Sequence, residues 1–238
     1  MSRVGAGRRG RPSVLTPYYR RVEKSHWAQW HEPYDDPSSP LSARLNEVKR
    51  QLGHVLDVVA PGPVRLLSVC AGQGRDVIDV LASHPRSRDV TARLVEFDPA
   101  NVAYATSRAA EIGRTDIEIV CGDASTTDAY QGIVPAEILL VCGVFGNISE
   151  QDMARTILLL PSLSAPGAYV IWTRHRRPPD LTGYIRSSFE RTGFVEVVFT
   201  APEDFVFTVG TQRLAREPEG YLRGRQLFTF VGDGALPA

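Results

Sequence analysis

The stretch that decides the fold of this chain reads Val64-Arg65-Leu66-Leu67-Ser68-Val69-Cys70-Ala71-Gly72-Gln73-Gly74-Arg75-Asp76. An apolar run leads into a turn of small residues, and a helical pattern follows at Val77, Ile78 and Leu81. A strand, a tight turn and a helix in this order are typical of nucleotide sites in open α/β sheets. Glycines in such a turn let the backbone approach a ligand, and the first turn of the helix offers unpaired N–H groups. The sequence therefore predicts a ligand site at 70–74.

Two later strands are expected to end next to this turn, and an acid lies at or just after the end of each strand. The second strand ends at Glu96, and the third leads into Gly122-Asp123-Ala124. An acid at the tip of the second strand is placed to accept hydrogen bonds from both hydroxyls of a ribose. An acid after the third strand can accept from the exocyclic amine of adenine. Together the three strand ends indicate an adenosyl ligand.

These motifs resemble those of the class I S-adenosylmethionine (SAM)-dependent methyltransferases over roughly residues 60–200. The resemblance implies that Glu96 holds the ribose, that Phe97 lies against the adenine, and that Asp123 caps the adenine amine. The chain departs from the family pattern at Ser68, where an acid is usual, and at Cys70, where glycine is usual. The cofactor-binding residues that the resemblance implies are Cys70, Ala71, Gly72, Gln73, Gly74, Glu96, Phe97, Gly122, Asp123, Ala124 and Cys142.

NAD is the competing cofactor. Its fingerprint requires a third glycine three residues after the second, and this chain has Val77 there. A literal match to GxGxxG occurs at Gly5–Gly10, but no strand precedes it and no apolar helix follows. SAM is therefore favoured over NAD.

Charge is distributed unevenly along the 238 residues, although 27 basic and 27 acidic side chains give a net charge of zero. Residues 1–24 carry seven basic side chains and one acidic side chain, a net +6, which leaves −6 for the remainder. A negative body disfavours nucleic acid as the substrate, because that ligand calls for a basic face. We therefore expect a small-molecule acceptor and no nucleic-acid partner.

Three segments are expected. Residues 1–12 would be a flexible basic arm, 13–60 an N-terminal lid and helix, and 61–238 the SAM-binding methyltransferase domain. No apolar stretch reaches the roughly 18–20 residues that cross a bilayer, and the first residues lack the apolar core of a secretory signal. The sequence predicts a cytoplasmic protein without a membrane partner, and it leaves a homodimer open.

The core alternates strand and helix, which predicts a parallel sheet with helices on both faces. After Gly193, two apolar runs at 195–199 and 205–209 predict an antiparallel hairpin on the sheet edge. The expected fold class is α/β, a Rossmann-like open sheet of about seven strands. The expected elements are strands 64–70, 90–96, 116–121, 136–142 and 167–173, and helices 75–83, 99–112, 124–130, 149–160 and 180–191.

Acceptor-binding residues are expected near the carboxyl ends of the strands and in the aromatic lid. A histidine among arginines after the fifth strand would bind a carboxylate or phosphate. The candidates for substrate contact are Tyr18, Trp30, Phe145, Asn147, Arg174 and His175. His26, His31 and Tyr34 are candidate catalytic residues, because oxygen methylation is helped by a base near neutral pKa.

No metal is expected, because Cys70, Cys121 and Cys142 lack metal-ligand spacing. The three thiols are instead predicted to be small buried side chains beside the cofactor.

The sequence thus favours in-line transfer of the SAM methyl group to oxygen or nitrogen of a small molecule, such as a secondary metabolite. Two alternatives keep the fold. One is a SAM-binding enzyme that catalyses a cyclisation or elimination, and the other is a non-catalytic SAM-binding module.

Overall fold

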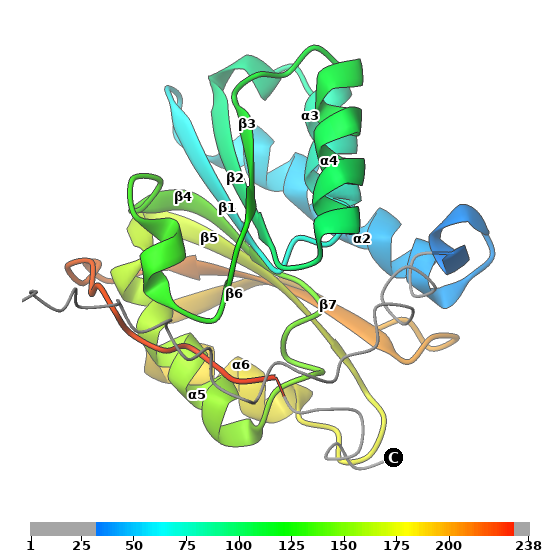
Figure 1. The fold of residues 1–238 in the computed structure, drawn as a ribbon. Coiled ribbons are helices and arrows are strands. Elements are labelled where there is room, and N and C mark those ends of the chain that lie inside the picture. The colour runs from blue at the N-terminus through cyan, green and yellow to red at the C-terminus, as the bar shows by residue number, and fades with distance from the viewer. Residues whose placement is uncertain (1–31, 231–238) are drawn as a thin grey trace, which may run out of the picture.

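A computed structural model describes residues 32–230 of the chain, and at its centre lies one seven-stranded sheet in the order β3-β2-β1-β4-β5-β7-β6 (Figure 1). Neighbouring strands from β3 to β5 pair in parallel, whereas β7 pairs antiparallel with both β5 and β6. The predicted Rossmann-like fold class is confirmed. The strands are β1 (Val64–Val69), β2 (Val90–Glu96), β3 (Ile117–Cys121), β4 (Ala136–Val141), β5 (Ser164–His175), β6 (Phe194–Thr200) and β7 (Phe207–Leu214).

Helices cover both faces of the sheet because its central strands are apolar on both sides. Leu66 faces one hydrophobic cluster and its neighbour Leu67 faces the other, as the period of two requires. The first cluster is covered by α2 (Pro40–Val58), α3 (Arg75–Ser83) and α4 (Pro99–Glu111). The second is covered by α5 (Glu150–Leu159) and α6 (Thr182–Arg191) (Figure 1). Short 3-10 helices are η2 (Glu32–Asp35), η3 (Ser87–Asp89), η4 (Thr127–Tyr130) and η5 (Leu160–Ser162).

Helix α2 begins where its sequence dictates. The Ser39 hydroxyl accepts from the Ser42 N–H at 3.0 Å, and Pro40 occupies the first turn, where its missing N–H costs nothing.

The polar side of α2 is bonded to the antiparallel strands. The Glu47 carboxylate accepts from the Thr200 hydroxyl, and the Gln51 amide oxygen accepts from the Thr211 hydroxyl. This network fixes α2 across β6 and β7.

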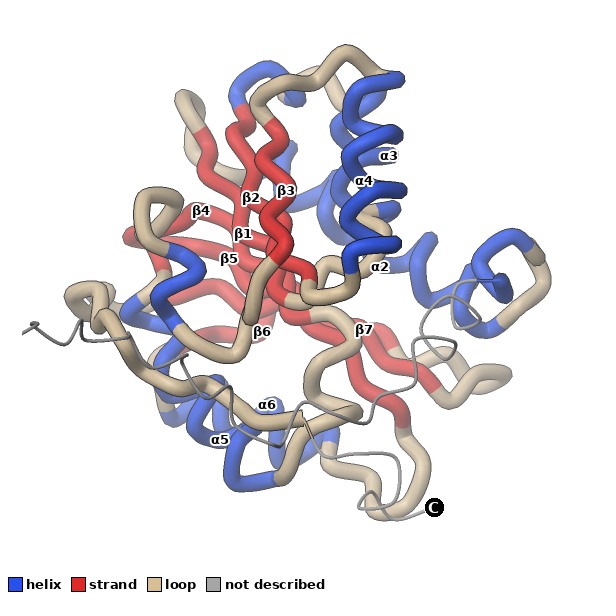
Figure 2. Tube along the Cα trace, in the orientation of Figure 1, coloured by secondary structure: helices blue, strands red, loops and turns tan. Residues whose placement is uncertain are grey.

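The predicted helix at 124–130 is wrong. Only the 3-10 helix η4 forms there, because the chain near residue 125 bonds to a distant segment that we call the C-terminal strap, residues 215–230 (Figure 2). The Leu227 N–H donates to the Ser125 carbonyl, and the Thr127 N–H donates to the Arg225 carbonyl. The strap then reaches α5, where the Thr229 N–H donates to Asp152.

The contact between Thr229 and Asp152 also decides how α5 is capped. Ser149 followed by Asp152 predicts a reciprocal capping box, in which each side chain caps the other residue's N–H. The Ser149 hydroxyl does accept from the Asp152 N–H at 3.1 Å. The Asp152 carboxylate, however, binds the strap at Thr229 and pairs with Arg155. The cap is therefore single, and the acid holds the strap.

No helix within residues 32–230 combines the length and apolar character needed to cross a bilayer.

Candidate functional site

The turn between β1 and α3 is built from left-handed backbone. Cys70, Gly72 and Gly74 have φ values of 54°, 56° and 64°. A Cβ on Gly74 would lie 2.5 Å from Cδ2 of Leu94 on β2, so this glycine lets α3 pack closely against the neighbouring strand. The Ala71 N–H donates to the Val95 carbonyl at 3.0 Å and fixes the turn to β2.

Cys70 is the sole non-glycine residue in the described part of the chain with a positive φ. The left-handed region costs an L-residue roughly 1–2 kcal/mol. The glycine that the methyltransferases this chain resembles usually have at this position would adopt this conformation freely. Cysteine at position 70 therefore stores strain in the turn. Burial, and then the charges of Glu96 and Asp123, raise the pKa of the Cys70 thiol, which is therefore protonated at neutral pH.

Glu96 joins the glycine turn to the tip of β2. Its Oε2 accepts from the Gly72 N–H at 2.7 Å, and its Oε1 accepts from the Asp98 N–H at 2.8 Å. A carboxylate has about four lone-pair sites, so each oxygen retains capacity for a further donor such as a hydroxyl. Next to Glu96, the residue Phe97 is 62% exposed.

The tip of β3 lies beside the tip of β2, because Cys121 is the register partner of Glu96. The Gly122 N–H donates to the Glu96 carbonyl at 2.9 Å, which brings Asp123 to the same edge. The Asp123 carboxylate accepts from the Ser125 N–H, and Ala124 is buried with its carbonyl bound by the Tyr130 hydroxyl. The structure thus brings the three predicted strand-end signals together at one edge of the sheet.

The three thiols differ in their surroundings. Cys121 is exposed, contrary to the prediction that all three would be buried, because β3 is an edge strand. Cys142 follows β4, and burial raises the pKa of its thiol well above the ordinary value. Neither Cys70 nor Cys142 is therefore a ready nucleophile, since the thiolate is the reactive form.

The loop after β4 is held by its own side chains. The Asn147 amide donates to the Gly143 carbonyl at 2.7 Å, and the Gly143 N–H donates to the Thr173 hydroxyl at 2.8 Å. The Phe145 ring is fully buried against Trp172 and Phe189, with centroids 6.2 and 6.4 Å apart. The ring thus belongs to the core, and the backbone of this loop faces the end of β5.

Arg174, near the carboxyl end of β5, is 8% exposed. Its Nη1 donates to the Phe145 carbonyl, whereas its Nε is buried without an acceptor. Burial lowers the pKa of this guanidinium. The neighbouring His175 has a buried Nδ1 without a partner, and burial, then Arg174 and Arg177, lower the pKa of His175 below 6.5. His175 is therefore neutral at pH 7, and Arg174 carries the charge at this strand end.

Of the predicted lid residues, Tyr18, His26, Trp30 and His31 lie outside the described part of the chain. Tyr34 is described, and its hydroxyl accepts from Nη2 of Arg44 at 2.8 Å. The Arg75 guanidinium lies over the rings of Tyr34 and Tyr104, 5.7 and 5.1 Å from their centroids. Arg75 also donates to Gln73 of the glycine turn, so η2 is fixed beside that turn. Sequence reasoning missed this role of Arg75, which only the spatial approach of η2 and α4 reveals.

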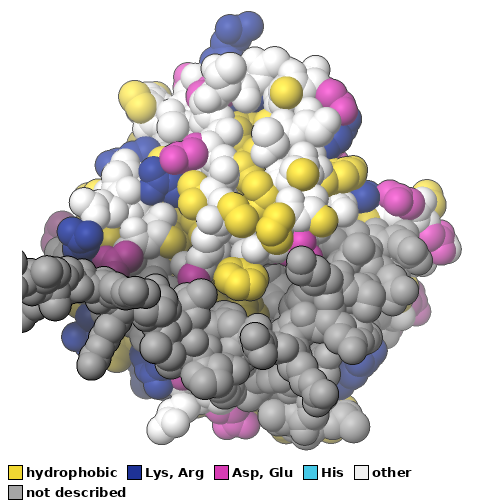
Figure 3. All heavy atoms as spheres, viewed as in Figure 1, with side chains coloured by type: hydrophobic (Ala, Val, Ile, Leu, Met, Phe, Trp, Pro, Cys, Tyr) yellow, Lys and Arg dark blue, Asp and Glu magenta, His cyan; other side chains and the backbone are white. Residues whose placement is uncertain are grey.

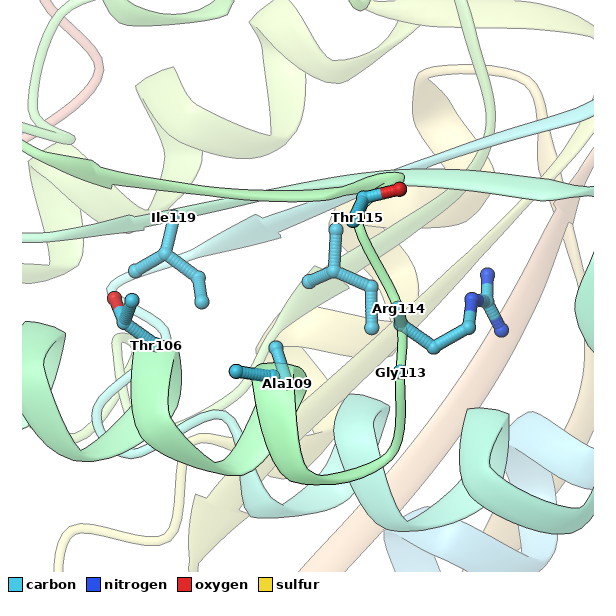
Figure 4. Close-up of a pocket in the computed structure, with 8 residues that line it drawn as sticks. Thr106, Ala109, Gly113, Arg114, Thr115 and Ile119 are labelled. Carbon is cyan, nitrogen blue, oxygen red and sulfur yellow. The ribbon is translucent and has the colours of Figure 1, made fainter.

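A groove of about 370 Å³ lies between α4 and β3 (Figure 4). Its walls include Thr106, Ala109 and Ile119, and Arg114 stands at its end. The guanidinium of Arg114 is fully engaged with Asp116 and with backbone carbonyls. The groove lies along the amino-terminal half of β3, away from the strand tips that hold Glu96 and Asp123. On the same face, Figure 3 shows hydrophobic side chains gathered over β3 and α4.

Comparison with proteins of known sequence gives one curated relative. The YnbC protein of Escherichia coli (strain K12), described as uncharacterized, is 29% identical over 131 residues. The match covers 53% of this chain and 22% of YnbC, so this chain spans about a fifth of the relative's length.

Solved structures share the fold at low identity. Magnesium protoporphyrin IX methyltransferase from Synechocystis PCC 6803 with bound SAM has a TM-score of 0.60 at 13% identity, covering 79% of this chain and 91% of that one. The [4+2]-cyclase SpnF has a TM-score of 0.52 at 17% identity over 72% and 81%. An rRNA methylase from Streptococcus thermophilus has a TM-score of 0.54 at 10% identity over 70% and 95%.

The family model Methyltransf_20, described as "Putative methyltransferase", matches residues 43–194, which run from α2 through the glycine turn and the strand tips to the start of β6. This match covers more than half of the chain and includes all the cofactor-side residues predicted from the sequence. The chain belongs to this family of methyltransferases.

Proposed function

We propose that the protein is a SAM-dependent methyltransferase that acts on a small-molecule acceptor. The observation that carries the proposal is the Glu96 carboxylate, which is bonded to the Gly72 N–H at the junction of the glycine turn and the tip of β2. When bound, SAM supplies an electrophilic methyl group on a sulfonium. The chain's residues then have to bind an adenosyl group, orient an acceptor and exclude water.

The residues at the strand tips fit such a group chemically. Glu96 has acceptor capacity left for two ribose hydroxyls. Phe97, which is 62% exposed beside that carboxylate, offers an apolar surface to a base. Asp123 is exposed at the tip after β3 and would accept from an exocyclic amine, with Ala124 below it. Gly72 presents its backbone without a Cβ.

On the acceptor side, Arg174 and His175 would recognise a carboxylate or phosphate of the small molecule. The support is the buried Nε of Arg174, which has no acceptor, since leaving a buried charged donor unpaired costs free energy that an anionic ligand would return. Much of the rate in this class of reaction would come from holding two reactants in line. The negative charge of residues 25–238 supports a small acceptor over a polyanion.

Isothermal titration calorimetry with S-adenosylhomocysteine (SAH) tests the cofactor assignment. We expect saturable binding of SAH and none of NADH at the same concentration, because Val77 stands where a dinucleotide fingerprint needs glycine. Binding of NADH in preference to SAH would reject the proposal. Incubation with methyl-labelled SAM and a panel of small carboxylic acids then asks whether label enters a product.

A second candidate is a SAM-binding enzyme of the same fold that does not transfer the methyl group. It is favoured by one observation, the similarity to the cyclase SpnF, which covers 72% of this chain. The labelling experiment separates the two functions, because a cyclase would change its substrate and leave the label in the cofactor.

A further inference from the structure

A cavity of about 230 Å³ lies at the end of the sheet opposite the strand tips. Its walls come from the carboxyl end of α2, from residues near the start of β4 and β5, and from a residue near the end of β7. The proposed transfer reaction uses none of these residues. The cavity is therefore separate from the proposed cofactor and acceptor sites.

The wall of this cavity is mostly aliphatic. Val58, Val59 and Ala60 line it on the side of α2, and Pro166 and Ala168 line it on the side of β5. Val58 is 47% exposed. Apolar surface that faces water in a hollow favours a ligand whose apolar part covers it.

Arg213 lines the cavity without a partner. Its side chain forms no hydrogen bond or ion pair with any residue in the described range. A Cβ on Gly167, which also lines the cavity, would lie 3.1 Å from Nη2 of Arg213. The missing side chain at Gly167 thus makes room for the guanidinium at the cavity wall.

Tyr169 supplies a second unpaired donor next to Arg213. The two residues are register partners on β5 and β7, so their side chains lie on the same face of the sheet. Tyr169 lines the cavity and is 8% exposed, yet its hydroxyl has no hydrogen-bond partner between residues 32 and 230. Because tyrosine hydroxyls this deeply buried usually have a partner, this one is available to a ligand.

The other charges at this end of the sheet are compensated. Glu137 lines the cavity, but its carboxylate accepts from Nε and Nη2 of Arg65, at 3.2 and 2.8 Å, and from the backbone N–H of the same arginine. Arg86, which binds backbone carbonyls at the end of α2, pairs with Asp89 at 3.0 Å. Among the described residues that line the cavity, Arg213 therefore carries the charge that lacks a counterion.

The apolar surface extends beyond the cavity. Val195 on β6 is the register partner of Arg213 on its other side and is 49% exposed. A compact group bound at Arg213 would leave this valine and Val58 facing water, whereas a flexible chain can cover such surface. An ion pair at an exposed arginine adds little affinity by itself, so the apolar chain has to supply most of it.

We propose that this cavity binds an aliphatic carboxylate of medium chain length. Arg213 holds the carboxylate group, the Tyr169 hydroxyl donates a second hydrogen bond to it, and the chain lies against the valines and Pro166. The inference does not depend on the proposed methyl transfer, since the cavity lies at the other end of the sheet.

Calorimetric titration of the full chain with octanoate tests the site. The titrations use the Arg174→Met variant as the background, so that the arginine at the end of β5 does not bind the probe. In this background Arg213→Gln should weaken octanoate binding about fivefold and Tyr169→Phe about threefold. Neither side chain has a partner in the described fold, so the midpoint of thermal unfolding without octanoate should stay that of the background variant. Arg88→Gln removes an exposed charge outside the cavity and should leave the octanoate affinity unchanged.

Chain length gives a second measurement, which isolates the apolar contribution. Each methylene added between butanoate and octanoate should raise the affinity by up to about fourfold, as burial of a methylene does. Octanol, which has no charge, should bind equally to the background variant and to Arg213→Gln. An octanoate affinity that does not change in Arg213→Gln, or no binding of octanoate at all, would overturn the proposal. Equal affinities for acetate and octanoate would indicate a general anion site and would also reject it.

Discussion

The Oε2 atom of Glu96 accepts a hydrogen bond of 2.7 Å from the backbone N–H of Gly72. This bond joins two features that the sequence presents separately, a glycine turn and an acid 24 residues later. The acid therefore shapes the turn as well as offering acceptor atoms to a ligand. Substitution at Glu96 should affect both stability and binding.

Glu96→Ala should weaken SAH binding by about 1–3 kcal/mol, the scale of a lost charged hydrogen bond. It should also lower the midpoint of thermal unfolding, because the Gly72 and Asp98 N–H groups lose their acceptor. Calorimetry and a thermal melt measure the two effects. Glu111→Ala, in a surface ion pair with Arg108, is the control and should change neither. An unchanged SAH affinity in Glu96→Ala would count against the ribose assignment.

Gly74→Ala should destabilise the protein more than Gly113→Ala. Both positions have left-handed backbone, with φ of 64° and 69°. A Cβ at Gly74 meets Leu94 Cδ2 at 2.5 Å, whereas nothing lies within 4 Å of one at Gly113. The difference in unfolding free energy should be about 1–3 kcal/mol, the usual cost of overpacking. Chemical denaturation of the two variants measures it, and equal losses would mean that α3 shifts freely from β2.

Replacing Cys70 tests the strain at the turn. Cys70→Gly should be more stable than Cys70→Ala by about 1 kcal/mol, because both lose the thiol and only glycine adopts a φ of 54° without strain. Denaturant unfolding of the pair compares their free energies. An alanine variant as stable as the glycine variant would show that the turn carries no such strain.

Glu47 predicts a defined loss of stability in acid. Burial opposes ionisation, but hydrogen bonds from Arg50, Thr200 and Gln51 outweigh it and lower the pKa of Glu47 from 4.5 to about 2. The stabilisation is present above about pH 4.5 and is lost as the pH falls toward 2. After allowance for solvent screening it amounts to about 1 kcal/mol. The free energy of unfolding, measured between about pH 5 and about pH 3, should change less with pH for Glu47→Gln than for the wild type.

Arg174→Met separates a recognition role from a structural one. Nε of Arg174 is buried without an acceptor, but Nη1 donates to the Phe145 carbonyl, so an apolar side chain of similar length should lower the unfolding free energy by no more than about 1–3 kcal/mol. Benzoate, a small carboxylate, should raise the midpoint of thermal unfolding of the SAH-bound wild type. It should have no such effect on the variant. Persistence of that protection, or a loss of stability above about 3 kcal/mol, would argue that Arg174 serves the fold instead.

Local patterns predicted the central elements well. Residues 75–83 and 90–96 form α3 and β2 with the expected limits, because a glycine turn precedes the helix and an acid ends the strand. The tips of three strands also meet as expected, since parallel strands share one edge for their carboxyl ends.

What the sequence did not reveal depends on partners far along the chain. Nothing in the sequence near 124–130 shows that the backbone there is hydrogen-bonded to Leu227 and Arg225, so a helix was expected. The hairpin was expected on the edge, but its second strand, β7, lies inside it against β5. Gly74 was expected to serve the ligand, and the structure shows its packing role against Leu94.

The account depends most directly on where an adenosyl group binds, and a crystal structure of the full chain grown with saturating SAH measures this. We expect electron density across the tips of β1, β2 and β3, with both ribose hydroxyls within hydrogen-bonding distance of the Glu96 carboxylate. Density for SAH at any other place, or none at these tips despite binding in solution, would contradict the central claim.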